Sequence, residues 1–261
     1  MSRPKKTPIS TRLNLALVGS TGRMGHKILE LLSSPDDPIA SAFNLVWHGS
    51  VRDPKALASL TKCKADLIID FSKPEATLSW VRAYAKTGKP AATLICTTGF
   101  NFSEIGILKK SLKDCTWALV PNTSLGVFAM SESLKLLART LPADYAFSVH
   151  ESHHAKKVDA PSGTGLFLQS LIESSRPKGA VVAISSVRGG SDPGTHTVTI
   201  LGPYEKITLT HSAEDRRLFA RGALTLGLAL FKQKTKNQIS LGKLALSESL
   251  TVRREEDLAE L

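Results

Sequence analysis

The first half of the chain alternates short apolar runs with amphipathic stretches, and this alternation constrains the fold more than any other feature. Strands alternating with helices favour a parallel sheet with right-handed crossovers, so the pattern predicts an α/β domain. The predicted strands cover residues 13–20, 43–51, 65–72, 91–99 and 115–122. The predicted helices between them cover residues 25–34, 74–88 and 102–114.

The pattern changes after about residue 124. Helical periodicity recurs at 131–141, 162–175 and 216–233, and 145–152 alternates like a strand. Three further runs, 180–190, 194–203 and 205–213, are separated by turns that contain glycine or proline, and we predict that they are antiparallel. The predicted fold class is α/β, with a Rossmann-like dinucleotide-binding domain and an α+β domain that has a mixed or antiparallel sheet.

Composition excludes several classes of protein. The chain has 261 residues, of which 42% are hydrophobic and 22% charged, as in soluble globular proteins. No apolar run reaches the roughly 18 residues of a membrane span, and the basic N-terminal segment lacks a signal-peptide core, so we expect a cytoplasmic protein with no membrane partner. Three cysteines without C-x-x-C spacing indicate neither a disulfide framework nor a structural metal site.

The chain is basic, with a formal net charge of +11. The lysines and arginines are scattered and no aromatic-rich binding motif accompanies them, so we do not expect a nucleic-acid partner. Two other interpretations fit the positive charge better than nucleic-acid binding does. One is pockets that bind phosphate and carboxylate groups, and the other is solubility.

A glycine loop, G-x-x-G-x-x-G, spans residues 19–25 between the first predicted strand and the first predicted helix. Its glycines permit a tight turn and close backbone approach, and the N-terminus of the helix favours a pyrophosphate. The pattern therefore predicts a dinucleotide site, and Arg23 either pairs with a phosphate or is solvated. The alternative is a tight turn without a ligand.

The end of the second strand carries no acid that would select the ribose of NAD. Arg52 lies close to this end instead, which favours tolerance of the 2′-phosphate of NADP. The alternative is that Arg52 and Lys55 are ordinary loop charges.

Two polar segments follow the fourth and fifth predicted strands. Residues 96–99 read Cys-Thr-Thr-Gly and residues 120–123 read Val-Pro-Asn-Thr. Open α/β sheets bind ligands at the carboxyl ends of their strands, so these groups are candidates to meet ribose and nicotinamide. We interpret Cys96 as a small packed residue, because no sequence feature indicates an activated thiol.

Residues 150–165, HESHHAKKVDAPSGTG, gather histidines, lysines and acids beside a Ser-Gly-Thr turn. His153 and Lys157 are four residues apart and share a face if this segment is helical. The main-chain N–H groups of 162–164 precede a helical run and form a potential anion site. A histidine and a lysine of lowered pKa can both transfer protons. The plainer alternative is a solvated loop with a helix cap, and the adjacent lysines disfavour a zinc site.

This stretch resembles the E-x-H-H-x-x-K-x-D-A-P-S-G-T signature of the 4-hydroxy-tetrahydrodipicolinate reductase family, also called dihydrodipicolinate reductases, which serve lysine synthesis in bacteria and plants. The resemblance extends over nearly the whole chain. Six other segments are similar to motifs of the family: VGSTGRMG, IIDFSKPEATL, CTTGF, PNTSLGV, VRGGSDPGTHTV and THSAEDRRLFARGAL.

The resemblance implies a dinucleotide-binding domain at 1–124, joined by the C-terminal segment 217–261. It also implies a substrate-binding domain at 125–216 whose sheet builds a homotetramer. His153 matches the catalytic histidine and Lys157 the proton donor. The implied substrate-binding residues are His154, Ser162, Gly163, Thr164 and Arg216. The implied cofactor contacts, beside our own candidate Arg52, are Gly19, Ser20, Thr21, Gly22, Arg23, Met24, Cys96, Thr97, Thr98, Val120, Pro121, Asn122 and Thr123.

Three positions depart from the family pattern. Cys96 replaces a glycine, Thr123 replaces a usual phenylalanine, and Phe128 stands where an asparagine is common. The segment after the second strand is also short, so the residue that selects the cofactor cannot be aligned there. These departures bear on cofactor preference and catalytic efficiency.

The implied reaction is hydride transfer from NADPH or NADH to the conjugated C=C–C=N system of a cyclic dicarboxylate, in the diaminopimelate route to lysine. Lys157, or His153 through it, is expected to protonate the neighbouring carbon, and no metal is expected. One rival is a semialdehyde dehydrogenase, which needs Cys96 as an activated thiol. A second rival is a nucleotide-sensing regulator without catalysis, and a third is a nucleic-acid binder, whose affinity falls steeply with salt.

Overall fold

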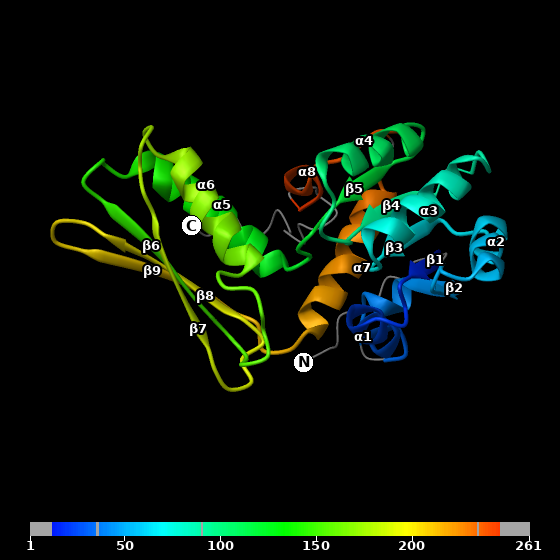
Figure 1. Cartoon of the computed structure of the whole chain (residues 1–261), viewed down its shortest axis with the longest axis horizontal. Coiled ribbons are helices and arrows are strands. Elements are labelled where there is room, and N and C mark those ends of the chain that lie inside the picture. The colour runs from blue at the N-terminus through cyan, green and yellow to red at the C-terminus, as the bar shows by residue number, and fades with distance from the viewer. Residues whose placement is uncertain (1–11, 35–36, 90, 234, 246–261) are drawn as a thin grey trace, which may run out of the picture. The chain divides into compact units, whose positions relative to one another are not determined.

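The computed structural model describes residues 12–34, 37–89, 91–233 and 235–245 (Figure 1). Most of the basic N-terminal segment and the end of the predicted C-terminal segment, 246–261, lie outside the described residues. The chain divides into two compact units, Met1–Thr123 with Phe219–Leu261, and Ser124–Leu218. Within the described ranges, no helix is both long and apolar enough to cross a membrane.

The first unit is built on a five-stranded parallel sheet in the order β2-β1-β3-β4-β5. The predicted α/β fold is therefore confirmed. The strand order reverses between β1 and β3, and such a switch point is where open sheets of this kind bind ligands. The strands are β1 (Leu13–Val18), β2 (Phe43–Gly49), β3 (Leu67–Asp70), β4 (Ala92–Ile95) and β5 (Trp117–Leu119).

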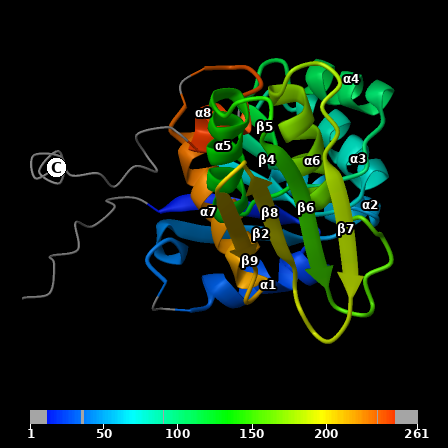
Figure 2. The same cartoon turned by 90° about the vertical axis from the view of Figure 1, so that its left-hand side faces the viewer.

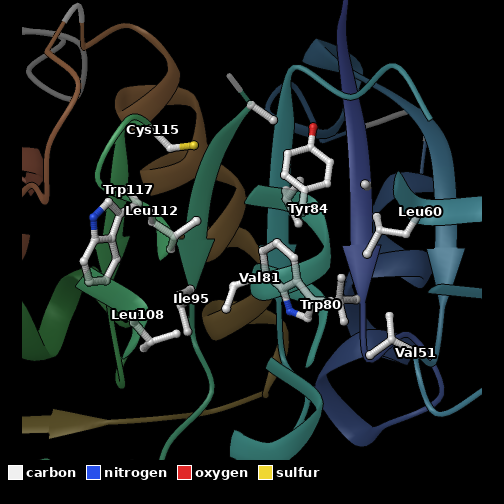
Figure 3. Close-up of a cluster of buried hydrophobic side chains, with 14 of the residues drawn as sticks. Val51, Leu60, Trp80, Val81, Tyr84, Ile95, Leu108, Leu112, Cys115 and Trp117 are labelled. Carbon is white, nitrogen blue, oxygen red and sulfur yellow. The ribbon is translucent and has the colours of Figure 1, made fainter. Parts of the chain in front are cut away.

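Helices cover both faces of this sheet. On one face, Trp80, Val81 and Tyr84 pack with Leu60 and Leu108 against the strands, and Figure 3 shows part of this cluster. On the other face, α7 approaches β3 so closely that a Cβ on Gly227 would lie 2.7 Å from the Leu67 side chain. The helices are α1 (Arg23–Leu32), α2 (Pro54–Lys62), α3 (Pro74–Ala85), α4 (Phe102–Ser111), α7 (Arg217–Phe231) and α8 (Leu241–Ala245), with a 3₁₀ turn at Ala40–Ala42.

The helix α2 was not predicted. Its start nevertheless carries a recognisable signal. Asp53 is the N-cap and its side chain accepts a hydrogen bond from the Lys55 N–H at 2.9 Å, and Pro54 occupies the first helical position. The short helix α8 was not predicted either.

The second unit has a mixed four-stranded sheet in the order β7-β6-β8-β9. β8 pairs antiparallel with β9, as predicted, and β6 also pairs antiparallel with β8. The prediction that 180–190 is antiparallel was wrong, because β7 runs parallel to β6. α6 connects these two strands as a crossover, and a crossover of this kind joins parallel strands. The strands are β6 (Ala146–His153), β7 (Ala183–Arg188), β8 (Thr195–Leu201) and β9 (Lys206–Ser212).

Two helices, α5 (Leu125–Thr140) and α6 (Gly163–Ser175), cover one face of the mixed sheet (Figure 2). Alternate residues of the strands, such as Phe147, Val149 and Val198, pack against them. The opposite face carries short polar side chains, including a hydrogen-bonded pair of Thr197 with Thr210 at 3.1 Å. α5 begins six residues before the predicted helix start at 131, because the Ser124 hydroxyl accepts from the Val127 N–H at 3.1 Å and caps it there.

Replacing Gly222 by alanine is expected to destabilise the first unit. A Cβ at this position of α7 would lie 1.9 Å from the Thr123 carbonyl oxygen, so α7 or the segment after β5 must shift. We expect the free energy of unfolding to fall by about 1–3 kcal/mol, the usual cost of overpacking, in urea titrations.

The matched control is Gly106→Ala in α4, where nothing lies within 4 Å of the added Cβ. This variant should gain about 0.5–1 kcal/mol from the higher helix propensity of alanine. Equal stability changes in the two variants would contradict the steric explanation.

Candidate active site

The glycine loop turns tightly at the carboxyl end of β1. Gly19 has a φ of +81°, and a Cβ there would lie 2.5 Å from the Phe71 carbonyl oxygen. A Cβ on Gly25 would lie 2.3 Å from the Gly19 carbonyl oxygen. The Gly19 N–H donates to the Gly49 carbonyl at 2.8 Å, which fixes the loop against the end of β2. The absence of side chains at these glycines therefore lets a ligand come close to the loop backbone at the N-terminus of α1, as the binding of a pyrophosphate requires.

The predicted cofactor residues around this loop differ in exposure. Ser20 is buried and its hydroxyl lies 3.4 Å from the His48 Nδ1, whereas Thr21 and Arg23 are exposed and Gly22 and Met24 are half-buried. Arg52 is exposed just beyond β2, and Asp53 beside it is engaged in capping α2.

A buried carboxylate, Asp70, organises the ends of β3 and β4. It accepts hydrogen bonds from the Trp80 Nε1 at 2.8 Å and the Thr77 hydroxyl at 2.6 Å. Thr97 is also buried, and its hydroxyl accepts from the Ser72 N–H at 3.1 Å. Burial raises the pKa of Asp70, and its hydrogen-bond donors oppose that effect. The Thr97 hydroxyl thus forms hydrogen bonds within the first unit, whereas Thr98 beside it is exposed.

Cys96 is packed and 4% exposed, as we interpreted it. Burial raises the pKa of its thiol well above the ordinary value, and the nearby Asp70 adds to this effect. A thiol in this state is protonated at neutral pH and is a poor nucleophile. This state of Cys96 argues against a semialdehyde dehydrogenase, because that chemistry needs an activated cysteine.

The segment after β5 is partly turned inwards. Val120 and Thr123 are buried, and the Thr123 hydroxyl donates to the Phe219 carbonyl at 2.8 Å at the start of α7. Pro121 is exposed, and Asn122 is half-buried. The threonine that departs from the family pattern therefore has its hydroxyl engaged with the chain, and Phe128 is half-buried in α5.

In the second unit, Glu151 and His153 project from the same side of β6 because side chains of a strand alternate. Glu151 is fully buried, and its Oε2 lies 2.5 Å from the His153 Nδ1. Arg188, on the neighbouring strand β7, donates hydrogen bonds to both oxygens of the Glu151 carboxylate, at 2.7 and 3.0 Å. The Ser162 N–H donates to the Glu151 Oε1 at 3.1 Å. One carboxylate thus contacts β6, β7 and the N-cap of α6.

A second buried histidine completes the cluster from β8. His196 lies opposite Glu151 in the strand register, and its ring centroid is 5.2 Å from that of His153. Its Nε2 is 3.2 Å from the Ser162 hydroxyl, which also caps α6 by accepting from the Gly165 N–H. Below the His153 ring lies Gly194, where a Cβ would approach the His153 Nε2 to 2.8 Å.

The electrostatics of the cluster favour an ionised carboxylate beside neutral histidines. Burial by itself would raise the pKa of Glu151, but hydrogen bonds from Arg188, His153 and the Ser162 amide lower it to about 2. Burial lowers the pKa of His153, and Glu151 opposes that shift. Burial lowers the pKa of His196 to about 4.

Glu151, His153 and His196 bring their ligand atoms within 4.8 Å of one another, a spacing that metal sites also show. Arg188 already neutralises the carboxylate through a bidentate ion pair, and a cation would have to displace it. We therefore assign no metal role to this cluster.

The remaining predicted site residues lie around the same strand end. The segment after His153 is a turn and not a helix, with the Lys157 N–H donating to the His154 carbonyl at 3.0 Å. The Lys157 Nζ pairs with Asp159 at 2.8 Å. His154 lies 3.3 Å from the Arg216 guanidinium, so the structure brings together two predicted substrate residues 62 positions apart. Gly163 and Thr164 form the first turn of α6.

Sequence reasoning missed four residues of this site, namely Glu151, Arg188, Gly194 and His196. Glu151 offered a signal, because an acid two residues before a histidine in a strand shares its face. Nothing in the local sequence indicates that Arg188 and His196 join it, since the pairing of β6 with both β7 and β8 brings them there.

A parallel sheet with a glycine loop in one unit, and a buried carboxylate with two buried histidines in the other, are typical of the class of two-domain dehydrogenases that use a nicotinamide cofactor. Residues 13–123 match the family described as dihydrodipicolinate reductase, N-terminus, and residues 126–244 match dihydrodipicolinate reductase, C-terminus. The chain belongs to the dihydrodipicolinate reductase family.

Individual relatives agree with this assignment. The chain is 32% identical to the 4-hydroxy-tetrahydrodipicolinate reductase of Nitrosomonas europaea, over 86% of this chain and 95% of that protein. It is 35% identical to that of Methanopyrus kandleri, over 81% and 89%. Among solved structures, the dipicolinate-bound dihydrodipicolinate reductase from Paenisporosarcina sp. TG-14 has a TM-score of 0.71 at 19% identity and covers 91% of this chain and 100% of that chain, which shows a shared fold.

The depressed pKa values predict a two-stage loss of stability in acid. His196 has a pKa of about 4 in the fold against 6.5 for the free side chain, so the unfolded chain binds a proton first as the pH falls. The free energy of unfolding should drop by on the order of 3 kcal/mol between about pH 6.5 and pH 4. Glu151 adds a further loss between its ordinary 4.5 and about 2.

Urea titrations across this pH range test the first stage. The variant His196→Asn should flatten the loss between pH 6.5 and 4, because the titrating group is gone. The control His150→Asn removes an exposed histidine of β6 and should leave the loss unchanged. Since the pKa of His153 is lowered as well, part of the loss should remain, and a loss as large in His196→Asn as in the unmodified chain would contradict this assignment.

Proposed function

We propose that this chain is an NAD(P)H-dependent 4-hydroxy-tetrahydrodipicolinate reductase in the diaminopimelate route to lysine, the activity for which its relatives are named. One observation carries the assignment of the site. His153, inside the family signature, is held by a buried carboxylate next to the Ser162–Thr164 turn, where an anion can bind. A proton-transfer group and a carboxylate-binding turn are what the reduction of a cyclic dicarboxylate needs.

The cofactor fits the first unit. Gly19 and Gly25 leave a backbone cradle that a Cβ would fill, and α1 has no acid in its first turn to repel a pyrophosphate. The reduced nicotinamide supplies the hydride when bound. We assign its phosphates to the loop from Gly19 to Met24, and its ribose and nicotinamide to the exposed groups after β4 and β5.

The proton comes from the second unit. Hydride addition builds negative charge along the conjugated system, and a nearby acid neutralises it. We assign that role to His153 and Lys157, at the end of β6 and in the turn that follows. The N–H groups at the start of α6, with His154 and Arg216, hold a carboxylate and so orient the ring.

We also propose that the protein works in the cytoplasm as a homotetramer built through the helix-free face of its mixed sheet. The cross-strand threonines on that face offer many short hydrogen-bonding groups on a regular surface. Light scattering coupled to size exclusion measures the assembly, and a monomeric mass would count against it.

Replacing His153 or Lys157 by alanine should lower kcat by about 10²–10⁴-fold, the usual contribution of a positioned acid, with little change in cofactor affinity. A coupled assay measures turnover, with the substrate made in place from pyruvate and aspartate semialdehyde. Quenching of tryptophan fluorescence measures cofactor binding.

Lys156→Ala is the matched control, because Lys156 is exposed in the same turn. It should keep near-normal kcat. Near-normal turnover in both test variants would overturn the assignment, and tight cofactor binding without any turnover in the unmodified chain would favour the nucleotide-sensing alternative.

Replacing Arg52 by alanine should reduce the preference for NADPH over NADH. We propose that its guanidinium pairs with the 2′-phosphate, and a hydrogen bond to a charged group contributes about 1.5–3 kcal/mol. The ratio of kcat/KM for NADPH to that for NADH should therefore fall by about tenfold or more. Lys55→Ala, in the first turn of α2, is the control. An unchanged ratio in Arg52→Ala would make Arg52 an ordinary loop charge.

A further inference from the structure

The Glu151 carboxylate contacts both halves of the proposed chemistry in the second unit. Its Oε2 lies 2.5 Å from the His153 Nδ1, and its Oε1 accepts the Ser162 N–H at 3.1 Å, where the anion-binding turn begins. Arg188 binds both oxygens and so prevents the carboxylate from rotating. The geometry therefore fixes the direction of each acceptor lone pair.

We propose that Glu151 is the positioning residue of the reaction, which holds His153 as the Nδ1–H tautomer with Nε2 as the atom that carries the exchangeable proton. The proposal rests on the proposed function, since it assigns a partner to His153. Among the described residues Nε2 has no hydrogen-bond partner, whereas Nδ1 is committed to the carboxylate. A second group that orients the ring and fixes the tautomer is the arrangement that proton-transferring histidines need.

The charges that face His153 come from four other places in the unit. Arg188 of β7 and Lys157 of the turn after β6 are cationic and lower the pKa of His153. The ring of His196, from β8, lies edge-on to the His153 ring. Asp192, between β7 and β8, is an anion that interacts with it. Burial also lowers the pKa of His153, and Glu151 opposes both effects. Without Glu151, a buried histidine would face two cations and would be a much weaker base.

A plainer role for Glu151 is to brace the sheet through its ion pair with Arg188. Two variants separate the roles, because each breaks the same ion pair. Glu151→Gln keeps the shape but removes the anion beside His153, so the pKa of His153 should fall by about one unit or more. Arg188→Met removes a cation and leaves the anion, so that pKa should rise. A bracing role alone predicts similar losses of stability in both variants and an unmoved pH profile of kcat/KM.

The first measurement is NMR of the chain with ¹⁵N-labelled histidine, with the His153 signals assigned by their loss in His153→Asn. In the unmodified protein, the neutral ring should be protonated at Nδ1, the minor tautomer in free histidine. Titration of the two variants should give the opposite pKa shifts. An Nε2–H tautomer in the unmodified protein overturns the proposal even if Glu151→Gln fails to fold, and shifts of the same sign overturn it as well.

The second measurement is the pH profile of kcat/KM in the coupled assay. Because His153 acts when protonated, the alkaline limb of Glu151→Gln should move about one unit toward acid. Its activity near pH 8 should fall about tenfold or more, and the limb of Arg188→Met should not move toward acid. An unmoved limb in Glu151→Gln overturns the catalytic part of the inference.

These readouts distinguish two failures. If His153→Ala turns over normally, the proposed function of His153 fails, whatever the tautomer is. If His153→Ala is inactive but the tautomer and the pKa shifts are not as expected, the role of Glu151 fails and the proposed function stands.

Discussion

The burial of one negative charge, on Glu151, governs the architecture of the second unit. A carboxylate removed from water is strongly destabilising unless several donors replace its hydration. Here the donors are the Arg188 guanidinium, the His153 ring and the Ser162 amide, and each belongs to a different segment of the chain. The charge therefore requires β6, β7 and the start of α6 to meet at one point. The same requirement places His153 near the Ser162–Thr164 turn.

The first unit solves a similar problem with Asp70. This buried carboxylate ties the end of β3 to α3 through Thr77 and Trp80, and Thr77 in turn lies 3.2 Å from the Thr97 hydroxyl after β4. The loops at the carboxyl edge of the sheet are thus held by buried polar contacts. Such contacts allow a ligand to meet a preformed surface, which reduces the entropy lost on binding.

Much of this arrangement follows from the sequence. The alternation of strands with helices determines the parallel sheet, and the glycine loop indicates the nucleotide site because only glycine fits where Gly19 and Gly25 lie. The motif around His153 indicates the proton-transfer site. The parallel pairing of β7 and the participation of Arg188 and His196 escaped prediction, because strand pairing depends on contacts between distant segments. The start of α5 and the whole of α2 were not predicted, although their N-caps Ser124 and Asp53 mark where the two helices begin.

The His153 ring lies so close to Gly194, in the loop between β7 and β8, that a Cβ there would come within 2.8 Å of its Nε2. The ring has no freedom to give way, since its other nitrogen is committed to Glu151. Position 194 is therefore closed to side chains for two reasons, because its backbone φ of +149° also disfavours any residue with a Cβ. A side chain at this position would displace the imidazole from Glu151, so the backbone at Gly194 is coupled to the geometry of the Glu151–His153 pair. The loop between β7 and β8 therefore limits where the His153 Nε2 can lie.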